Sequence, residues 1–179
     1  MTQEEVKTFF SWITSKRDKA LFGMAYHYGL RVKEITLLNR TDVKFQENKI
    51  RIKRVKGGVS GEKPLRKDTK RLLKRYFRER IDQHEALFIG KQGRLKKRRI
   101  QQLFSIYVEK AGLSGYSVHS LRHSIAVHIL DAGEPIEFVQ DHLGHKNVQN
   151  TQIYSKISDR KRKEVFERLQ ESVNIVRLL

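Results

Sequence analysis

Two sequence motifs decide how the rest of the chain is interpreted: HSLRH at residues 119–123 and LGHKNVQNTQIY at residues 143–154. His119 and Arg122 are three residues apart, so on a helix they lie on the same face. The apolar residues between the motifs are spaced as in two short helices, which would bring a second histidine and Tyr154 back towards that face. Arginine binds phosphate oxygens through a planar fork, histidine transfers protons near neutral pH, and tyrosine can act as a covalent nucleophile. This combination indicates tyrosine attack on a phosphate.

The composition indicates one domain that binds a polyanion. The chain has 179 residues, and 38 Lys and Arg against 20 Asp and Glu give a formal net charge of +18. Nucleic acid is the first expected partner of so basic a domain, and an anionic membrane surface is the second. No apolar run reaches the roughly 18 residues of a membrane span. The lack of cysteine excludes disulfides and thiolate metal sites and fits a cytoplasmic protein.

The hydrophobic pattern predicts an α+β fold that is mainly α-helical, with one small antiparallel sheet. Between residues 42 and 66 apolar and polar residues alternate as in strands, and Gly57-Gly58 fits the turn of a hairpin, so we expect about three strands. In the helix expected over 67–82, Ile81 should be buried with the other apolar residues. The segment 87–90 should be an apolar connector. The remaining helices are expected over 2–13, from Ser15 to Gly29, and over 31–38, 94–111, 117–133, 135–143 and 159–172.

Together the motifs resemble the catalytic domain of the tyrosine recombinase (phage integrase) family. The family pattern is H-x-x-R, then L-G-H, then a tyrosine nine residues after that histidine, and order, spacing and residue types all match. Arg31 and Glu34 are similar to the family's first arginine box, although a surface arginine paired with a glutamate one turn away is the simpler alternative. VKGG at 55–58 is similar to a hairpin that carries a lysine in the family. The likeness covers about residues 1–172 and implies a helical catalytic domain with a three-stranded sheet.

The resemblance implies roles for the residues that would handle the phosphate. Tyr154 would be the nucleophile, forming a 3′-phosphotyrosine link and releasing a 5′-hydroxyl. Arg31 and Arg122 would clamp the scissile phosphate. Lys56 would protonate the leaving oxygen, or else would be a solvated turn lysine. Its nearby rivals are Lys53, Arg54 and Lys63.

The resemblance also assigns the histidines and the acidic residue. His119 would be the general base, and His145 a phosphate ligand or a second acid–base group. Glu34 would orient the first arginine or His119. The remaining histidines of this region are interpreted as packing or surface residues: His123, His128 and His142.

The densest run of positive charge lies at the start of the helix expected over 94–111. Its members are Arg94, Lys96, Lys97, Arg98 and Arg99. A solvated face is the alternative, but at this net charge we expect them to contact DNA phosphates, which fixes position without reading sequence.

These expectations add up to a site-specific recombinase or integrase that acts on double-stranded DNA without ATP, metal or another cofactor. The resemblance implies a homo-tetramer on DNA and a catalytic domain over 1–172. The tail at 173–179 is apolar, so docking on a neighbouring protomer is an expectation for it. Because the first helix begins at residue 2, the N-terminal helical domain of most family members is expected to be absent. The alternatives are a type IB topoisomerase-like enzyme and a DNA-binding regulator that does not cleave.

Overall fold

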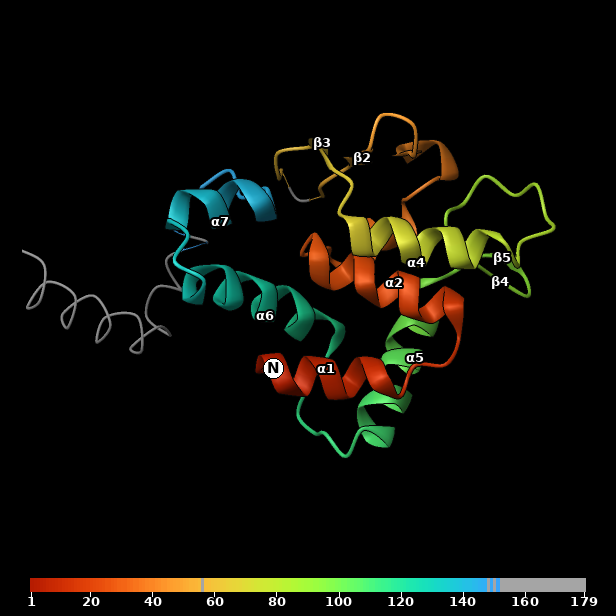
Figure 1. Cartoon of the computed structure of the whole chain (residues 1–179), viewed down its shortest axis with the longest axis horizontal. Helices are drawn as coiled ribbons and strands as arrows, with labels where there is room; N and C mark the ends of the chain where they lie inside the picture. The colour runs from red at the N-terminus through yellow and green to blue at the C-terminus, as the bar shows by residue number, and fades with distance from the viewer. Residues whose placement is uncertain (56, 148, 150, 152–179) are drawn as a thin grey trace, which may run out of the picture.

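Helices make up most of the computed structural model, which describes residues 1–55, 57–147, 149 and 151 (Figure 1). The helices are α1 (Gln3–Ser11), α2 (Lys16–His27), α3 (Val32–Thr36), α4 (Lys67–Phe77), α5 (Lys97–Lys110), α6 (Val118–Asp131) and α7 (Ile136–Leu143), with a 3₁₀ turn at Arg40–Asp42. The strands are β1 (Val43–Lys44), β2 (Lys49–Ile52), β3 (Gly61–Pro64), β4 (Ile89–Gly90) and β5 (Gly93–Arg94). The predicted mainly helical α+β fold is confirmed. The helix expected over 159–172 lies outside the described residues.

The sheet predicted between residues 42 and 66 is present as three antiparallel strands in the order β1-β2-β3. Val43 pairs with Ile50, and Ile52 pairs with Gly61. The buried residues of β2, Ile50 and Ile52, lie at every second position. A second, two-stranded sheet joins β4 to β5. It was not predicted, because strands of two residues have no measurable alternation. The helix expected from residue 94 begins at Lys97, because Arg94 pairs with Ile89 in this sheet.

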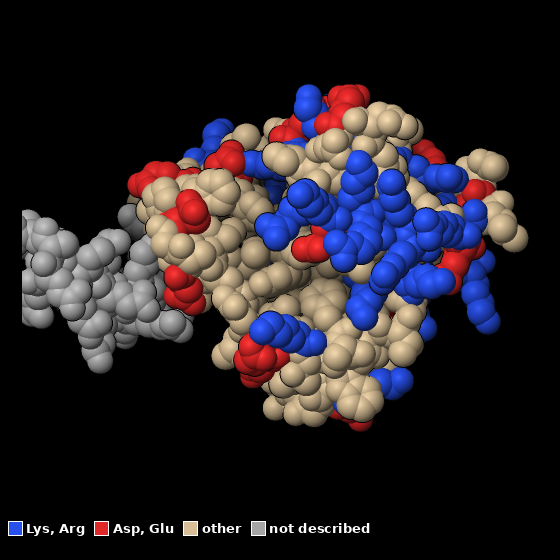
Figure 2. Space-filling view, in the orientation of Figure 1, with Lys and Arg blue, Asp and Glu red and all other residues tan. Residues whose placement is uncertain are grey.

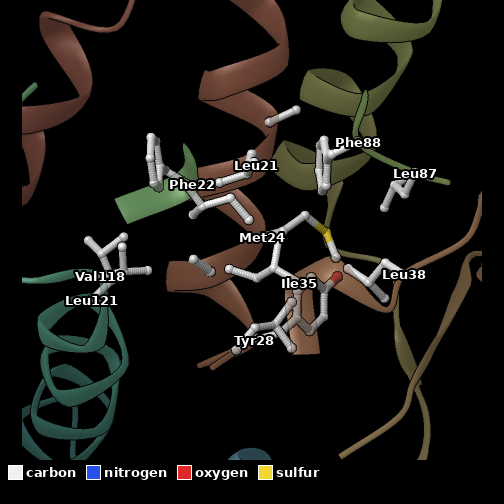
Figure 3. Packing of buried hydrophobic residues seen from close by; sticks show 14 of the residues in the cluster. Leu21, Phe22, Met24, Tyr28, Ile35, Leu38, Leu87, Phe88, Val118 and Leu121 are labelled. Atoms are coloured by element: carbon white, nitrogen blue, oxygen red, sulfur yellow. The ribbon is translucent and has the colours of Figure 1, made fainter. Parts of the chain in front are cut away.

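The core is built around α2, which packs against both α4 and α6. Figure 3 shows Leu21, Phe22 and Met24 of α2 among side chains from the segment 87–88 and from the start of α6. A smaller apolar cluster joins α6 to α7: Ala126, Leu130, Val139 and Leu143. Through these two clusters the first turns of α6 join the main core, with Val118 and Leu121, and its later turns pack against α7.

The prediction that Ile81 is buried is wrong, since the residue is 98% exposed. Helix α4 ends at Phe77, earlier than expected. Beyond it Arg80 turns inward and donates hydrogen bonds to the carboxylate of Asp82 and to the carbonyl oxygens of Ala86 and Leu87 at 2.8 and 2.9 Å. A buried guanidinium requires such acceptors, so the chain bends around Arg80 and Ile81 points outward.

Among the helices that the structure describes, none combines the length and the apolar composition that crossing a membrane requires.

Candidate active site

The turn that joins α2 to α3 lies at the centre of the candidate site. Gly29 in this turn has φ +56°, and a Cβ added to it would overlap a methyl group of Leu143 at the end of α7. Only glycine combines this backbone conformation with so close an approach. The carbonyl oxygen of Gly29 accepts hydrogen bonds from the guanidinium groups of Arg54, at 3.3 Å, and of Arg122. One carbonyl oxygen of this turn therefore binds side chains from two other segments, the β2–β3 connection and α6.

Glu34 is the carboxylate of the site, and its side chain is fully buried. One oxygen accepts from the Arg31 guanidinium at 2.8 Å, and the other from the Arg31 backbone N–H and the Arg54 guanidinium, both at 2.9 Å. The Arg122 guanidinium lies 4.0 Å away. Burial alone would raise the pKa of Glu34, but the charge of Arg54 and the hydrogen bonds from Arg31 outweigh it and leave the pKa below its usual value. Glu34 is thus an ionised group that binds two arginines and lies close to a third.

Arg122 and His145 form the second half of the site. Arg122, only 1% exposed, lies on the second turn of α6 and donates to the carbonyl of Leu143 at 3.0 Å. It also lies 2.8 Å from Nε2 of His145. Because arginine only donates, Nε2 must accept, so the proton of the neutral ring is on Nδ1 and is donated to the Thr151 hydroxyl at 2.9 Å. Burial, followed by the charges of Arg122 and Arg31, lowers the pKa of His145 to about 4 and keeps it neutral near pH 7.

His119 lies one helical turn before Arg122, as the spacing predicted. Its ring packs edge-to-face on His123, with the ring centroids 4.5 Å apart. The side chain is exposed on one side, yet burial of the rest of the imidazole, followed by the charges of His123 and Arg122, lowers the pKa of His119 to about 4. The ring is therefore neutral near pH 7 and accessible, as a proton acceptor must be.

The sequence offered Arg54 only as an alternative to Lys56 for the proton donor, but in the structure Arg54 is buried at the centre of the site. Its side chain is 1% exposed and donates to Glu34, Gly29 and two further carbonyls, those of Tyr28 at 2.9 Å and of His142 at 2.7 Å. The sequence held a signal for this burial. Ile50, Ile52 and Arg54 continue one alternation, so the arginine falls on the inward face of the strand.

Two further contacts fasten the β2–β3 hairpin to α7 and its C-cap residue. The backbone N–H of Val59 donates to the carbonyl of Gly144 at 3.0 Å. Lys63, a second rival of Lys56, binds the carboxylate of Asp141. Lys56 and Tyr154 themselves lie outside the described residues, so their predicted roles stay predictions.

The predicted basic cluster divides into two parts. Arg94 is held internally: its guanidinium donates to the carbonyls of Thr36 and Leu38 and to the side chains of Asn39 and Glu85. The residues 96–99 are exposed around the start of α5. They adjoin a cavity of about 650 Å³ whose lining includes Arg17, Lys91, Lys96 and Arg99.

A second basic surface lies on α4. Figure 2 shows Lys and Arg side chains crowded over this helix, whose exposed members include Lys67, Arg71, Lys74 and Arg75. The sequence predicts a helix over this segment but assigns no DNA contact to these residues.

Comparisons with known proteins identify the family and the fold of this chain. Residues 1–161 match the profile of the Phage integrase family. Tyrosine recombinase XerA of Pyrococcus horikoshii is 34% identical over 172 residues, which are 94% of this chain and 60% of the relative. A crystal structure of XerA recombinase is similar with a TM-score of 0.82 and 26% identity, over 97% of this chain and 63% of that one.

A structure of XerH site-specific recombinase shares the fold, with a TM-score of 0.78 and 23% identity over 96% of this chain and 53% of that chain. The chain thus spans between half and two thirds of the length of these proteins. Since the family profile matches most of its residues, the chain belongs to the phage integrase family.

Proposed function

We propose that this chain is the catalytic part of a site-specific DNA recombinase that cleaves and rejoins strands through a covalent 3′-phosphotyrosine link. The observation that carries the proposal is a connected set of contacts between distant parts of the sequence. Arg31 binds the buried Glu34, Arg122 binds the Gly29 turn 4.0 Å from Glu34, and His145 contacts Arg122. Positive groups held this rigidly suit an anion whose charge grows during a reaction.

The phosphate chemistry follows from the charges. A phosphodiester carries one negative charge, and attack on phosphorus places more on its non-bridging oxygens. Arg31 and Arg122 would bind these oxygens, and removing one such preorganised donor typically raises the barrier by about 3 kcal/mol. His145, neutral near pH 7, would contact the phosphate as a ligand or act as a second acid–base group.

The bonds and protons balance without a cofactor. The Tyr154 oxygen attacks phosphorus, and its proton passes to a base, for which the neutral His119 is the candidate. The bond from phosphorus to the 5′ oxygen breaks, and Lys56 gives that oxygen a proton. One phosphoester bond forms as another breaks, so the 5′-hydroxyl can reverse the step without ATP or a metal ion.

The partner we propose is double-stranded DNA, bound by several copies of the protein, with a tetramer as the expected assembly. The net charge of +18 and the exposed residues 96–99 support a polyanionic partner. XerH recombinase, which shares the fold, is bound in its structure to a palindromic difH substrate.

The test is the trapping of a covalent adduct. Duplexes selected for binding to the protein are nicked near the site, so that cleavage releases a short strand and cannot be reversed, and products are separated on denaturing gels. We expect an adduct with the natural chain, none with Tyr154→Phe, and an unchanged amount with the control Tyr116→Phe, whose hydroxyl binds Glu5. An adduct that persists in Tyr154→Phe would remove that residue from the mechanism. No adduct with any selected duplex would favour the non-cleaving regulator.

A further inference from the structure

The roles proposed above for DNA binding and for the reaction do not explain why Arg54 is buried beside Glu34. It is a buried arginine at the end of the inward alternation of β2, and its four hydrogen-bond acceptors come from three separate segments: Tyr28 and Gly29, Glu34, and His142. A buried charge is expensive unless it is paired and fully hydrogen-bonded, so this set of acceptors is what allows Arg54 to be there.

We infer that Arg54 is a positioning residue that keeps Arg31 and Arg122 available for the scissile phosphate, an inference that rests on the proposed function. The shared acceptors carry the argument. Arg54 and Arg31 divide the two oxygens of Glu34, and Arg54 and Arg122 share the carbonyl of Gly29. Removing Arg54 leaves both acceptors to the other two arginines.

The charge balance points the same way. Three guanidinium groups surround the carboxylate of Glu34, with Arg122 the most distant at 4.0 Å. With Arg54 in place two positive charges remain in excess, enough for a phosphodiester that gains charge as it reacts. Without Arg54 only one remains, and Glu34 draws Arg122 towards itself, away from any substrate. Such pairing is strong because the groups are buried in a medium of low dielectric constant.

Arg54 also fixes the end of α7, where the LGH motif begins. It donates to the carbonyl of His142, three residues before His145. Gly144 lies so close that a Cβ added there would approach the Cγ and Nε of Arg54 at 2.9 Å. The arginine therefore holds the chain segment that presents His145 to Arg122, so it acts on both halves of the site without touching substrate.

The test compares cleavage, binding and stability in Arg54→Met and Arg54→Lys with the control Arg80→Met. Arg80 is an equally buried arginine, with 2% of its side chain exposed, and it binds Asp82 and carbonyls of its own loop. Cleavage of the nicked duplex is measured in single turnover at saturating protein, DNA affinity by titration, and stability by thermal unfolding. We expect Arg54→Met to slow cleavage about 100-fold and Arg54→Lys less, with DNA affinity changed less than about threefold.

The charge of the substrate provides a second measurement, because a folding defect would lower the cleavage rate equally on charged and uncharged substrates. The scissile phosphate is replaced by a methylphosphonate, which lacks the negative charge that the arginines would neutralise. We expect the loss caused by Arg54→Met to shrink from about 100-fold to under about tenfold on this duplex, whereas Arg80→Met loses the same factor on both.

The outcomes separate the two claims. The positioning role would be overturned if Arg54→Met lost the same factor in cleavage rate on both duplexes. It would also be overturned if the cleavage rates of the Arg54 variants fell in step with their melting temperatures, as in Arg80→Met. If Arg54→Met does not fold, Arg54→Lys is judged by the same comparison. Wild-type protein that forms no adduct on the normal duplex defeats the proposed function itself, whereas an adduct with unchanged rates in both Arg54 variants defeats only the inference about Arg54.

Discussion

Replacing Gly29 by alanine tests how closely α7 packs on the turn that carries the site. Gly29 has φ +56°, and a side chain in this left-handed region costs about 1–2 kcal/mol. The added methyl group would also overlap the Leu143 side chain, and such overpacking adds about 1–3 kcal/mol. We therefore expect Gly29→Ala to lower the free energy of unfolding by about 2–5 kcal/mol in urea titrations.

Gly112→Ala is the matched control for this prediction. Gly112 has φ +66°, and a Cβ added there meets nothing within 4 Å, so its substitution carries only the backbone part, about 1–2 kcal/mol. The difference between the two variants isolates the contact with Leu143. If Gly29→Ala were no more destabilising than Gly112→Ala, the end of α7 would not pack on this turn as described, and the convergence of Arg122 and His145 would lose its support.

Three further predictions concern charge. Because the pKa of His145 is lowered to about 4 in the folded chain, against about 6.5 when unfolded, the unfolded chain takes up protons first as the pH falls, and stability is lost from about pH 6.5 downward. Urea titrations should show about 2 kcal/mol of loss from this residue between pH 7 and 5, and His145→Asn should remove that part; an unchanged pH dependence would contradict the lowered pKa. Changing residues 96–99 together to alanine should reduce the slope of log affinity for DNA against log salt by about 3, with stability preserved. Arg94→Ala, by contrast, should lower stability, because its four acceptors lie within the protein; a large loss of slope with unchanged stability would reverse that assignment.

The sequence predicted the parts of the site that depend on local periodicity. His119 and Arg122 share a helix face because their spacing fits one turn, and the alternation over residues 42–66 predicted the three-stranded sheet. In each case the pattern and the structure involve neighbours in the chain.

The features that sequence patterns did not reveal depend on long-range contacts. Arg54 finds acceptors as distant as residue 142, and no local pattern shows that these will be near. Arg94 looked like a DNA contact because of its basic neighbours, yet its acceptors include Thr36 and Leu38. Ile81 fits the helical period of α4, but Arg80 binds the loop that follows and the helix stops. In each case the hydrogen-bond acceptors of an arginine determine where the side chains lie. Those acceptors come together only in the complete fold.

The attachment of the β2–β3 connection to α7 has a mechanical consequence. The bond from Val59 to Gly144 and the ion pair between Lys63 and Asp141 lie on opposite sides of Arg54's own contact with α7. A movement of the hairpin relative to the helix would have to break all three contacts. A displacement of the hairpin would therefore also act on the chain segment that leads from α7 to His145.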